Sequence, residues 1–576
     1  MIRRTYPAPV AIRRFSFGWA DLVVVVGTLG LLLLIGRIGS GTLASFAPPQ
    51  HLPTVSLDPR NLPYYAGRSA LRMFAALILS FAFTLVYGYV AAHSRRAERV
   101  LVPLLDILQS VPVLGFLSIT VTGFIALFRG SLLGLECASV FAVFTAQAWN
   151  MTFSFYQSLR TLPHELSEAV RLYRLSGWER FTRLELPHAT IGLVWNAMMS
   201  FGGGWFFLAA SEAISVLNSK YTLPGVGSYV AAAVEKQDIH ALGWALLTIA
   251  ATIVLIDQLF WRPIVVWADR FRLEQSAASD APHSWLYDLL RAAHLPRLIE
   301  SSYRPASDAA ARVLCRMTSR PTGFGKNPIE PRVDRLYNAA LVSAVALLTV
   351  LAAHFIVMTV GAGEILKALW LGAATLGRVI VLLVFATLIW TPLGVAIGFN
   401  PRLARLLQPV VQFLASFPAN LIFPFATLLF IRHHISINWG SILLMALGAQ
   451  WYILFNAIAG AISVPTDLRE MTDDLGLRGW NRWRSLIIPG IFSAWVTGGI
   501  TASGGAWNAS IVSEVVSWGQ TKLVASGLGA YIADATARGD WPRITLGIAM
   551  MSVFVVTVNR FFWRRLYRLA EVKYRL

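Results

Sequence analysis

The chain has 576 residues, of which 56% are hydrophobic and only 14% are charged. This composition excludes a set of ordinary soluble domains and indicates a polytopic membrane protein. The formal net charge of +19 comes from basic residues spread over many short segments, which favours contact with lipid headgroups and argues against nucleic-acid binding.

About 12 apolar runs, each close to the length that crosses a bilayer as a helix, follow one another along the chain. The alternation typical of a membrane β-barrel does not occur in these runs. The sequence therefore predicts an all-α polytopic membrane protein with about 12 transmembrane helices. The first six expected spans cover 19–36, 70–92, 104–128, 132–157, 190–217 and 241–267, and the second six cover 336–360, 366–397, 406–431, 438–462, 491–518 and 542–563.

The distribution of basic residues sets the expected orientation. Most of the 49 Lys and Arg residues lie in the two tails and in the segments that follow the even-numbered spans. Because cytoplasmic loops are enriched in these residues, the tails and those segments are expected in the cytoplasm. Both termini are therefore predicted to be cytoplasmic.

The second half of the chain repeats the first, with an offset of 306 residues early and 302 residues later. The offset aligns LQSVPV with LASFPA, SGWERF with RGWNRW, and SEAIS with SEVVS. An even number of spans separates the matched positions, so the repeats are parallel. We expect two six-span halves, 1–267 and 336–576. They are joined by a polar cytoplasmic segment, 268–335, which is either a flexible linker or contains an amphipathic surface helix.

A polar, basic segment lies between the fourth and fifth spans of each half. A proline can begin a helix there, a glycine followed by tryptophan can break it, and a second proline should end the second helical stretch. The sequence predicts a helix-turn-helix on the cytoplasmic surface at 163–187 and again at 465–489. The residues that give these signals are Pro163, Gly177, Trp178 and Pro187 in the first half and Pro465, Gly479, Trp480 and Pro489 in the second.

Both segments resemble the EAA loop of binding-protein-dependent ABC importer permeases, the surface that engages the ATPase. The resemblance is carried by Glu168, Ala169, Val170, Leu184, Leu186 and Pro187 in the first half and by Glu470, Gly476, Leu486, Ile488 and Pro489 in the second. Arg174 departs from the pattern at the motif glycine, and Met471 and Thr472 replace the two alanines. The ATPase-coupling residues that the resemblance implies are Glu168, Ala169, Gly177, Trp178, Pro187, Glu470, Gly476, Gly479, Trp480 and Pro489.

The resemblance implies a type I ABC importer permease fold in a bacterial inner membrane, with two permease halves fused in one chain. The stretches GAWNASIVSEVV and GLGAYI resemble the nitrate, taurine and sulfonate branch, so the expected solute is a small anion such as nitrate, a sulfonate or bicarbonate. Its expected partners are membrane lipid, two copies of a cytoplasmic ABC ATPase and a periplasmic or lipid-anchored substrate-binding protein.

ATP hydrolysis is expected in the partner subunits. The stretch GFGKN at 323–327 lacks the first glycine and the Ser or Thr that a phosphate-binding loop requires. We therefore expect no catalytic residue, no metal and no cofactor in this chain, with ATP and Mg bound by the ATPase.

Polar residues inside the expected spans are candidates for the translocation pathway, because each costs free energy in lipid unless it meets a partner or water. Trp205 and Glu212 lie seven residues apart on one helix face, as do their repeat equivalents. The alternative interpretation is that each glutamate is a buried tie between helices, with Arg72 and Arg378 as candidate partners. The pathway candidates are Pro112, Trp205, Ser211, Glu212 and Ser215, with Pro418, Trp507, Asn508, Ser513, Glu514 and Ser517 in the second half.

Two other classes of protein fit parts of the sequence. A twelve-span secondary transporter would use an ion gradient, and the intramembrane acids could serve it as a proton relay. A structural scaffold would transport nothing. The secondary transporter has no reason to carry two EAA-like segments, and the scaffold is distinguished by whether ATPase and binding-protein genes adjoin this one. An importer permease that works by alternating access is the favoured interpretation.

Overall fold

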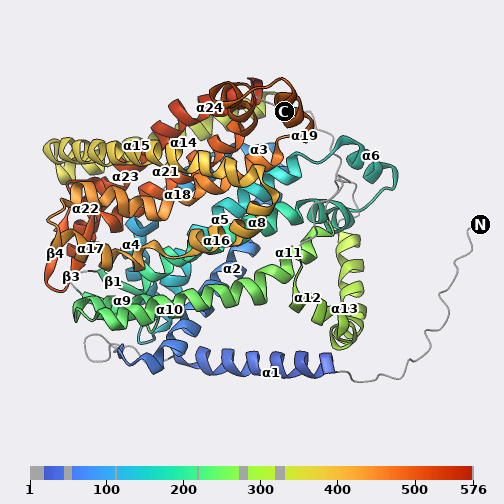
Figure 1. Cartoon of the computed structure of the whole chain (residues 1–576), viewed down its shortest axis with the longest axis horizontal. Helices are drawn as coiled ribbons and strands as arrows, with labels where there is room; N and C mark the ends of the chain where they lie inside the picture. Colours follow the sequence, from blue (N-terminus) through green and yellow to red (C-terminus); the bar gives the residue numbers. More distant parts are fainter. Residues whose placement is uncertain are drawn as a thin grey trace, which may run out of the picture. The chain divides into compact units, whose positions relative to one another are not determined.

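The computed structural model describes residues 19–43, 55–110, 113–216, 219–271, 283–317 and 331–573. These residues are helical apart from two short antiparallel hairpins (Figure 1). Pro112 and the GFGKN stretch lie outside the described residues. Contacts divide the chain into two compact units, one of 1–38, 162–191 and 256–325, and a larger one of 39–161, 192–255 and 326–576.

Within the described residues, nine helices are long and apolar enough to cross a membrane, fewer than the expected 12. Two further apolar helices, α9 (Val226–Glu235) and α17 (Phe423–Arg432), are shorter. The nine candidates are Trp19–Gly39, Pro59–His93, Gly177–Glu212, Ile239–Asp269, Tyr337–Val360, Ala362–Phe399, Ile437–Ser463, Gly479–Ser513 and Trp541–Ala570.

The expected third span of each half is divided into two helices. In the first half these are α3 (Arg95–Ser110) and α4 (Val113–Leu127), and in the second α16 (Pro401–Ser416) and α17. Phe417 and Pro418 take extended backbone conformations, with ψ of 127° and 102°. The cause is Pro418, which lacks an N–H and disfavours a helical conformation in the residue before it. The expected fourth span of the first half is α5 (Leu133–Arg160).

The larger unit is built from long helices (Figure 1). They pack on one another closely, through small residues. In the first half α2 (Leu62–His93) packs on α5, and in the second half α18 (Ile437–Ser463) packs on both α15 (Ala362–Phe399) and α21 (Ile488–Ser513). A Cβ placed on Gly394 or Gly398 of α15 would lie only 2.6 Å from an alanine Cβ of α18. Glycine therefore permits the close approach of these helices, as in other membrane bundles.

The fifth spans end earlier than expected, because a hairpin replaces their last residues. The first half has α8 (Leu186–Glu212) followed by β1 (Ala213–Val216) and β2 (Ser219–Thr222). The second half has α21 followed by β3 (Val515–Trp518) and β4 (Thr521–Val524). Ser215 and Ser517, expected beside the acids on a helix, are thus strand residues that pair with Lys220 and Lys522.

The hairpins link the two halves within the larger unit. Strand β1 of the first half contacts α22 (Leu528–Arg538) of the second, and β3 of the second half contacts α9 of the first. The N–H of Gly519, between β3 and β4, donates to the carbonyl of Val234 at 3.1 Å. Each half thus contributes a hairpin that contacts the short helix following the hairpin of the other half.

The expected helix-turn-helix segments are present, with one correction. The first helices are α6 (His164–Leu172) and α19 (Thr466–Asp474), and after a turn come α7 (Gly177–Arg180) and α20 (Gly479–Arg482). The second stretch was expected to end before Pro187 and Pro489, but it continues into α8 and α21.

A wider π turn before each proline explains this continuity. The N–H of Leu186 bonds to the carbonyl of Phe181, five residues back, and that of Ile488 bonds to the carbonyl of Trp483. A π turn changes which carbonyl each amide meets, and it is a known way to accommodate a local defect without ending a helix. The proline is therefore accommodated by a local change from four-residue to five-residue hydrogen bonds, and the helix continues past it.

The smaller unit contains part of the expected linker, which forms helices. These are α12 (Trp285–Ala292), capped by Ser284, and α13 (Leu295–Met317), which packs on α7. The buried carboxylate of Asp21 in α1 (Trp19–Gly39) accepts a hydrogen bond from the backbone N–H of His294 at 2.5 Å. The first helix and the linker are therefore held together in this unit.

Candidate functional site

The carboxylate of Glu212, at the end of α8, is fully buried and bonded from three sides. It accepts hydrogen bonds from the guanidinium of Arg72 at 2.6 Å, the hydroxyl of Ser69 at 2.6 Å and the backbone N–H of Gly227 at 2.7 Å. Only 1% of Glu212 and 2% of Arg72 are exposed. Arg72 is therefore an ion-pair partner in the bundle interior and does not extend to the membrane surface.

The second half builds a closely similar arrangement, in which the backbone N–H donor is shifted by one residue, because Gly227 corresponds to Gly529 and not to Ala530. Glu514 accepts from Arg378 at 2.8 Å, from the hydroxyl of Thr375 at 2.8 Å and from the N–H of Ala530 at 3.0 Å. The offsets of 306 and 302 residues relate Ser69 to Thr375, Arg72 to Arg378 and Glu212 to Glu514. In both sites, a buried glutamate at the end of the fifth helix bonds to the second helix and to the short helix that follows the hairpin.

The glycines of the GVG and GLG motifs make room for these carboxylates. A Cβ on Gly225 would lie 2.3 Å from the carboxylate of Glu212, and one on Gly527 would lie 2.2 Å from that of Glu514. These glycines are the N-caps of α9 and α22. Each glutamate thus supplies the negative charge that a helix N-terminus favours, and the glycine allows it to come close.

The first-half site carries an additional ion pair that the second-half site lacks. Glu136 of α5 accepts from Arg72 at 2.5 Å and 2.8 Å, and it also pairs with Arg68. The repeat places Asn438 at the position of Glu136 and Ala374 at that of Arg68. Asn438 keeps the contact with arginine, accepting from Arg378 at 2.8 Å. Each site is therefore electrically balanced, with two charges of each sign in the first half and one of each in the second.

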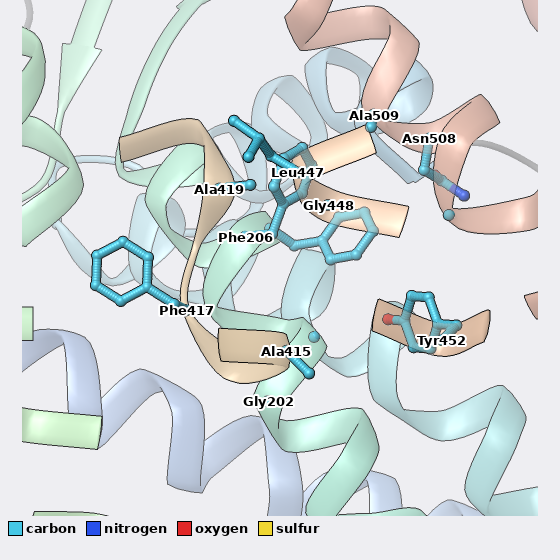
Figure 2. A pocket seen from close by; sticks show the side chains of 13 residues that line it. Gly202, Phe206, Ala415, Phe417, Ala419, Leu447, Gly448, Tyr452, Asn508 and Ala509 are labelled. Atoms are coloured by element: carbon cyan, nitrogen blue, oxygen red, sulfur yellow. The ribbon is translucent and has the colours of Figure 1, made fainter. Parts of the chain in front are cut away.

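A small cavity of about 50 Å³ lies within the larger unit, between helices of the two halves (Figure 2). Most lining side chains are apolar or absent, and the polar ones are Tyr452 of α18 and Asn508 of α21. The amide oxygen of Asn508 accepts from the backbone N–H of Val113, the first residue of α4, at 3.0 Å. The lining residues are Gly202, Gly203, Phe206, Phe207, Ala415, Phe417, Ala419, Leu447, Gly448, Tyr452, Gly505, Asn508 and Ala509.

Of the expected pathway residues, Asn508 lines this cavity, and Phe417 beside Pro418 does too. Trp205 and Trp507 are buried among other side chains, Trp507 stacked on Phe554. Ser211 bonds to Ser139 at 2.7 Å, Ser513 is fully buried, and Ser517 is exposed on β3. The sequence interpretation missed Tyr452 as a lining residue. The available signal was the glycines of α8 and α21 that line the same cavity, Gly202, Gly203 and Gly505.

The two helix-turn-helix segments, 163–187 and 465–489, expose apolar side chains. Leu172 is 83% and Tyr173 78% exposed at the end of α6, while Met471, Leu475 and Trp480 are exposed in the second segment. Arg174 and Gly476 occupy equivalent left-handed turn positions, with φ of 48° and 66°. Glu168 and Glu470 lie exposed on α6 and α19. The ion pairs within the two segments differ: Arg180 pairs with Glu185 in the first segment, and Arg482 pairs with Asp473 in the second.

A bundle of long apolar helices, repeated in sequence and enclosing a small cavity between its related halves, defines the membrane-spanning part of a transport system. The chain matches the family described as "Binding-protein-dependent transport system inner membrane component" twice, over residues 68–260 and 390–571. The chain belongs to this family. Its members are non-catalytic, multi-pass transport subunits of the inner membrane and carry no cofactor.

Individual relatives align with only part of the chain. The bicarbonate transport system permease protein CmpB of Synechococcus elongatus is 26% identical over 192 residues, 33% of this chain and 66% of that protein. The nitrate import permease protein NrtB of Leptolyngbya laminosa is 25% identical over 199 residues, 34% of this chain and 68% of that protein. The diacetylchitobiose uptake system permease protein NgcG of Streptomyces coelicolor is 28% identical over 113 residues, 19% of this chain and 37% of that protein. The alignment with CmpB thus spans just under two thirds of that relative.

Proposed function

We propose that the chain is the fused permease of an ATP-driven ABC importer that moves a small anion inward by alternating access. In this proposal it has two six-span halves, 1–267 and 336–576, joined by the linker 268–335, with both termini in the cytoplasm. The observation that carries the proposal is the pair of exposed helix-turn-helix segments, one before the fifth helix of each half, in a chain that matches the family twice.

The proposed partners are two copies of a cytoplasmic ABC ATPase, one for each coupling segment, and a binding protein on the opposite face. The second segment continues directly into α21, whose other end carries Glu514. With 26 residues, α21 is about 39 Å long. A push on the segment is therefore transmitted along one rigid helix to the far end of the bundle. A small anion is supported by the relatives CmpB and NrtB, named for bicarbonate and nitrate.

The buried acids favour this proposal over a secondary transporter. Glu212 and Glu514 each bond to an arginine and to a helix N-terminus, so we infer that they hold helices together. A proton relay would need carboxylates that reach water or another titrating group. A carboxylate paired with arginine also avoids repelling an anion that passes elsewhere in the bundle.

Two substitutions in the second coupling segment test the proposal. Gly479 has φ of 56°, which proline cannot adopt, so Gly479→Pro must break the turn before Trp480. Glu470→Lys reverses an exposed charge on α19. In proteoliposomes that hold the chain with its ATPase and are supplied with the binding protein, both variants are expected to keep ATP hydrolysis but lose ATP-driven nitrate uptake.

Gly363→Ala is the control, because no atom lies within 4 Å of the added Cβ. An unchanged elution profile in detergent would show that the spans remain folded. Normal uptake by both segment variants would contradict the docking role. Uptake driven by a proton gradient without ATP would establish the secondary transporter instead.

A further inference from the structure

Tyr452 fills a gap between two repeat-related glycines. Gly203 of α8 and Gly505 of α21 are 302 residues apart, which is the repeat offset. A Cβ on Gly203 would lie 3.1 Å from the hydroxyl oxygen of Tyr452, and one on Gly505 would lie 3.4 Å from its ring. The ring thus occupies space that the fifth helices of both halves leave open by having no side chain there.

The repeat shows that this ring belongs to one half alone. The equivalent of Tyr452 in the first half is Asn150, whose amide oxygen accepts a hydrogen bond from Gln109 at 3.0 Å. The position that carries a large aromatic ring in the second half thus carries a short polar side chain in the first, and that side chain is bonded within its own half. A single side chain can therefore seal the junction, since no second ring competes for the same gap.

The hydroxyl of Tyr452 is available to a ligand. It forms no hydrogen bond with any residue that the structure describes, and in Figure 2 it is on the side of the ring that faces the Gly202 helix. Asn508, the other polar lining residue, uses its amide oxygen for Val113 and its amide nitrogen for the carbonyl of Gly504 at 3.1 Å. Tyr452 therefore offers the cavity a hydroxyl donor that no described residue uses, whereas Asn508 already commits its oxygen and one of its two amide N–H groups.

The cavity itself is small and neutral. Its volume of about 50 Å³ has room for a few water molecules or a solute of similar size. The lining residues given by the described part of the chain carry no formal charge. A neutral wall with a donor but no carboxylate suits a small, weakly hydrated hydrogen-bond acceptor, such as an oxyanion with about four non-hydrogen atoms.

We propose that Tyr452 is the gate of the translocation pathway. Its ring closes the junction between Gly203 and Gly505, and its hydroxyl donates a hydrogen bond to a small oxyanion that passes when the ring swings aside. This inference rests on the proposed function, because it assigns a residue and a solute class to the pathway of that importer.

Passive nitrate efflux from proteoliposomes tests the seal. The vesicles contain the full chain with its ATPase, are loaded with potassium nitrate and receive no ATP. Tyr452→Ala is expected to raise efflux at least about tenfold, the equivalent of removing ~1.4 kcal/mol of barrier. Tyr452→Phe keeps the ring and should stay as tight as the unchanged protein. Gly504→Ala is the matched control on α21, because its added Cβ meets no atom within 4 Å.

The hydroxyl is tested by ATP-driven uptake of the same anion. Tyr452→Phe should slow nitrate uptake about fivefold, the rate equivalent of one hydrogen bond of ~1 kcal/mol. If passive nitrate efflux from Tyr452→Ala vesicles equals that of the unchanged protein, Tyr452 is not the gate. If efflux rises in Tyr452→Phe vesicles, the ring is not what closes the pathway. If the unchanged protein, supplied with its ATPase and the binding protein, takes up no nitrate with ATP while the Ala variant leaks, ATP-driven nitrate import fails, whereas closure of the junction by the ring is still supported.

Discussion

At the scale of single residues, the buried charges are the most constrained feature of the molecule. In the first half, Arg68 and Arg72 face Glu136 and Glu212 in a site from which water is excluded. An ion that loses its partner in such a place costs several kcal/mol, whereas a balanced set can be replaced at little cost. The second half demonstrates a balanced alternative, with Ala374 and Asn438 at the two variable positions.

We predict that Arg68 and Glu136 can be replaced without a large loss of stability only when both are replaced. Arg68→Ala or Glu136→Asn alone leaves one uncompensated buried charge and should lower stability by ~3–5 kcal/mol. The double variant copies the second half and should recover most of that loss. Thermal unfolding of the purified protein in detergent measures all three. Additive losses in the double variant would contradict the charge-balance argument.

At the scale of elements, the coupling segments show how one turn is made from different residues. Both first helices end in a left-handed residue, which is glycine in one half and arginine in the other. The backbone bonds agree, since Leu175 N–H bonds to Val170 and Leu477 N–H to Thr472, each closing the end of its helix. The conformation is therefore set by the helix end, and the residue type alters only its free energy.

We predict opposite effects at these two positions. Gly476→Ala forces a side chain into the left-handed region and should destabilise the local turn by ~1 kcal/mol. Arg174→Gly removes that strain and should stabilise its turn by up to ~1 kcal/mol. Hydrogen exchange of the amides in α19 and α6 measures each local opening. Equal protection in all variants would show that these turns do not limit opening.

The sequence predicted these elements well where the signal was local. Prolines and glycines indicated both helix-turn-helix segments. The third span of the second half was expected to be continuous over 406–431, although Pro418, which interrupts it, is visible in the sequence. The hairpins after Glu212 and Glu514 were missed, because short apolar runs do not distinguish a strand from the end of a helix. The additional pair of Arg68 and Glu136 was missed as well, since they lie 68 residues apart and meet only in the folded bundle.

At the scale of the whole molecule, the third span of each half is hydrogen-bonded, just after its break, to the fifth helix of the other half. Val113, just after the break of the first half, donates to Asn508 in the fifth helix of the second. The side chain of Asn420, just after the break of the second half, donates to the carbonyl of Phe206 in the fifth helix of the first at 3.1 Å. Phe206 and Asn508 are repeat equivalents, whereas their partners are shifted by one residue, because Val113 corresponds to Ala419. Each third span therefore contacts the same position of the opposite fifth helix, with the polar side chain on the fifth helix in one case and on the third span in the other.

We predict unequal costs for removing these two amides. Asn508→Leu leaves the buried N–H of Val113 without its partner and should cost ~1–3 kcal/mol. Asn420→Leu loses one hydrogen bond but also removes a buried amide oxygen that has no partner among the described residues, so its net effect should be near zero. Thermal unfolding of the two variants in the same detergent compares them. A larger loss for Asn420→Leu would contradict this account of the contact.

The paired sites of the two halves also limit the routes by which such a chain can change over generations. A duplicated segment can accumulate substitutions freely on its lipid-facing side, where each one stands alone. Inside the charged site, a first substitution produces an intermediate that folds poorly until a second one neutralises it. Divergence between the copies there is favoured in coupled steps, and the replacement of both Arg68 and Glu136 by uncharged residues, Ala374 and Asn438, in the other copy is the outcome that such a step produces.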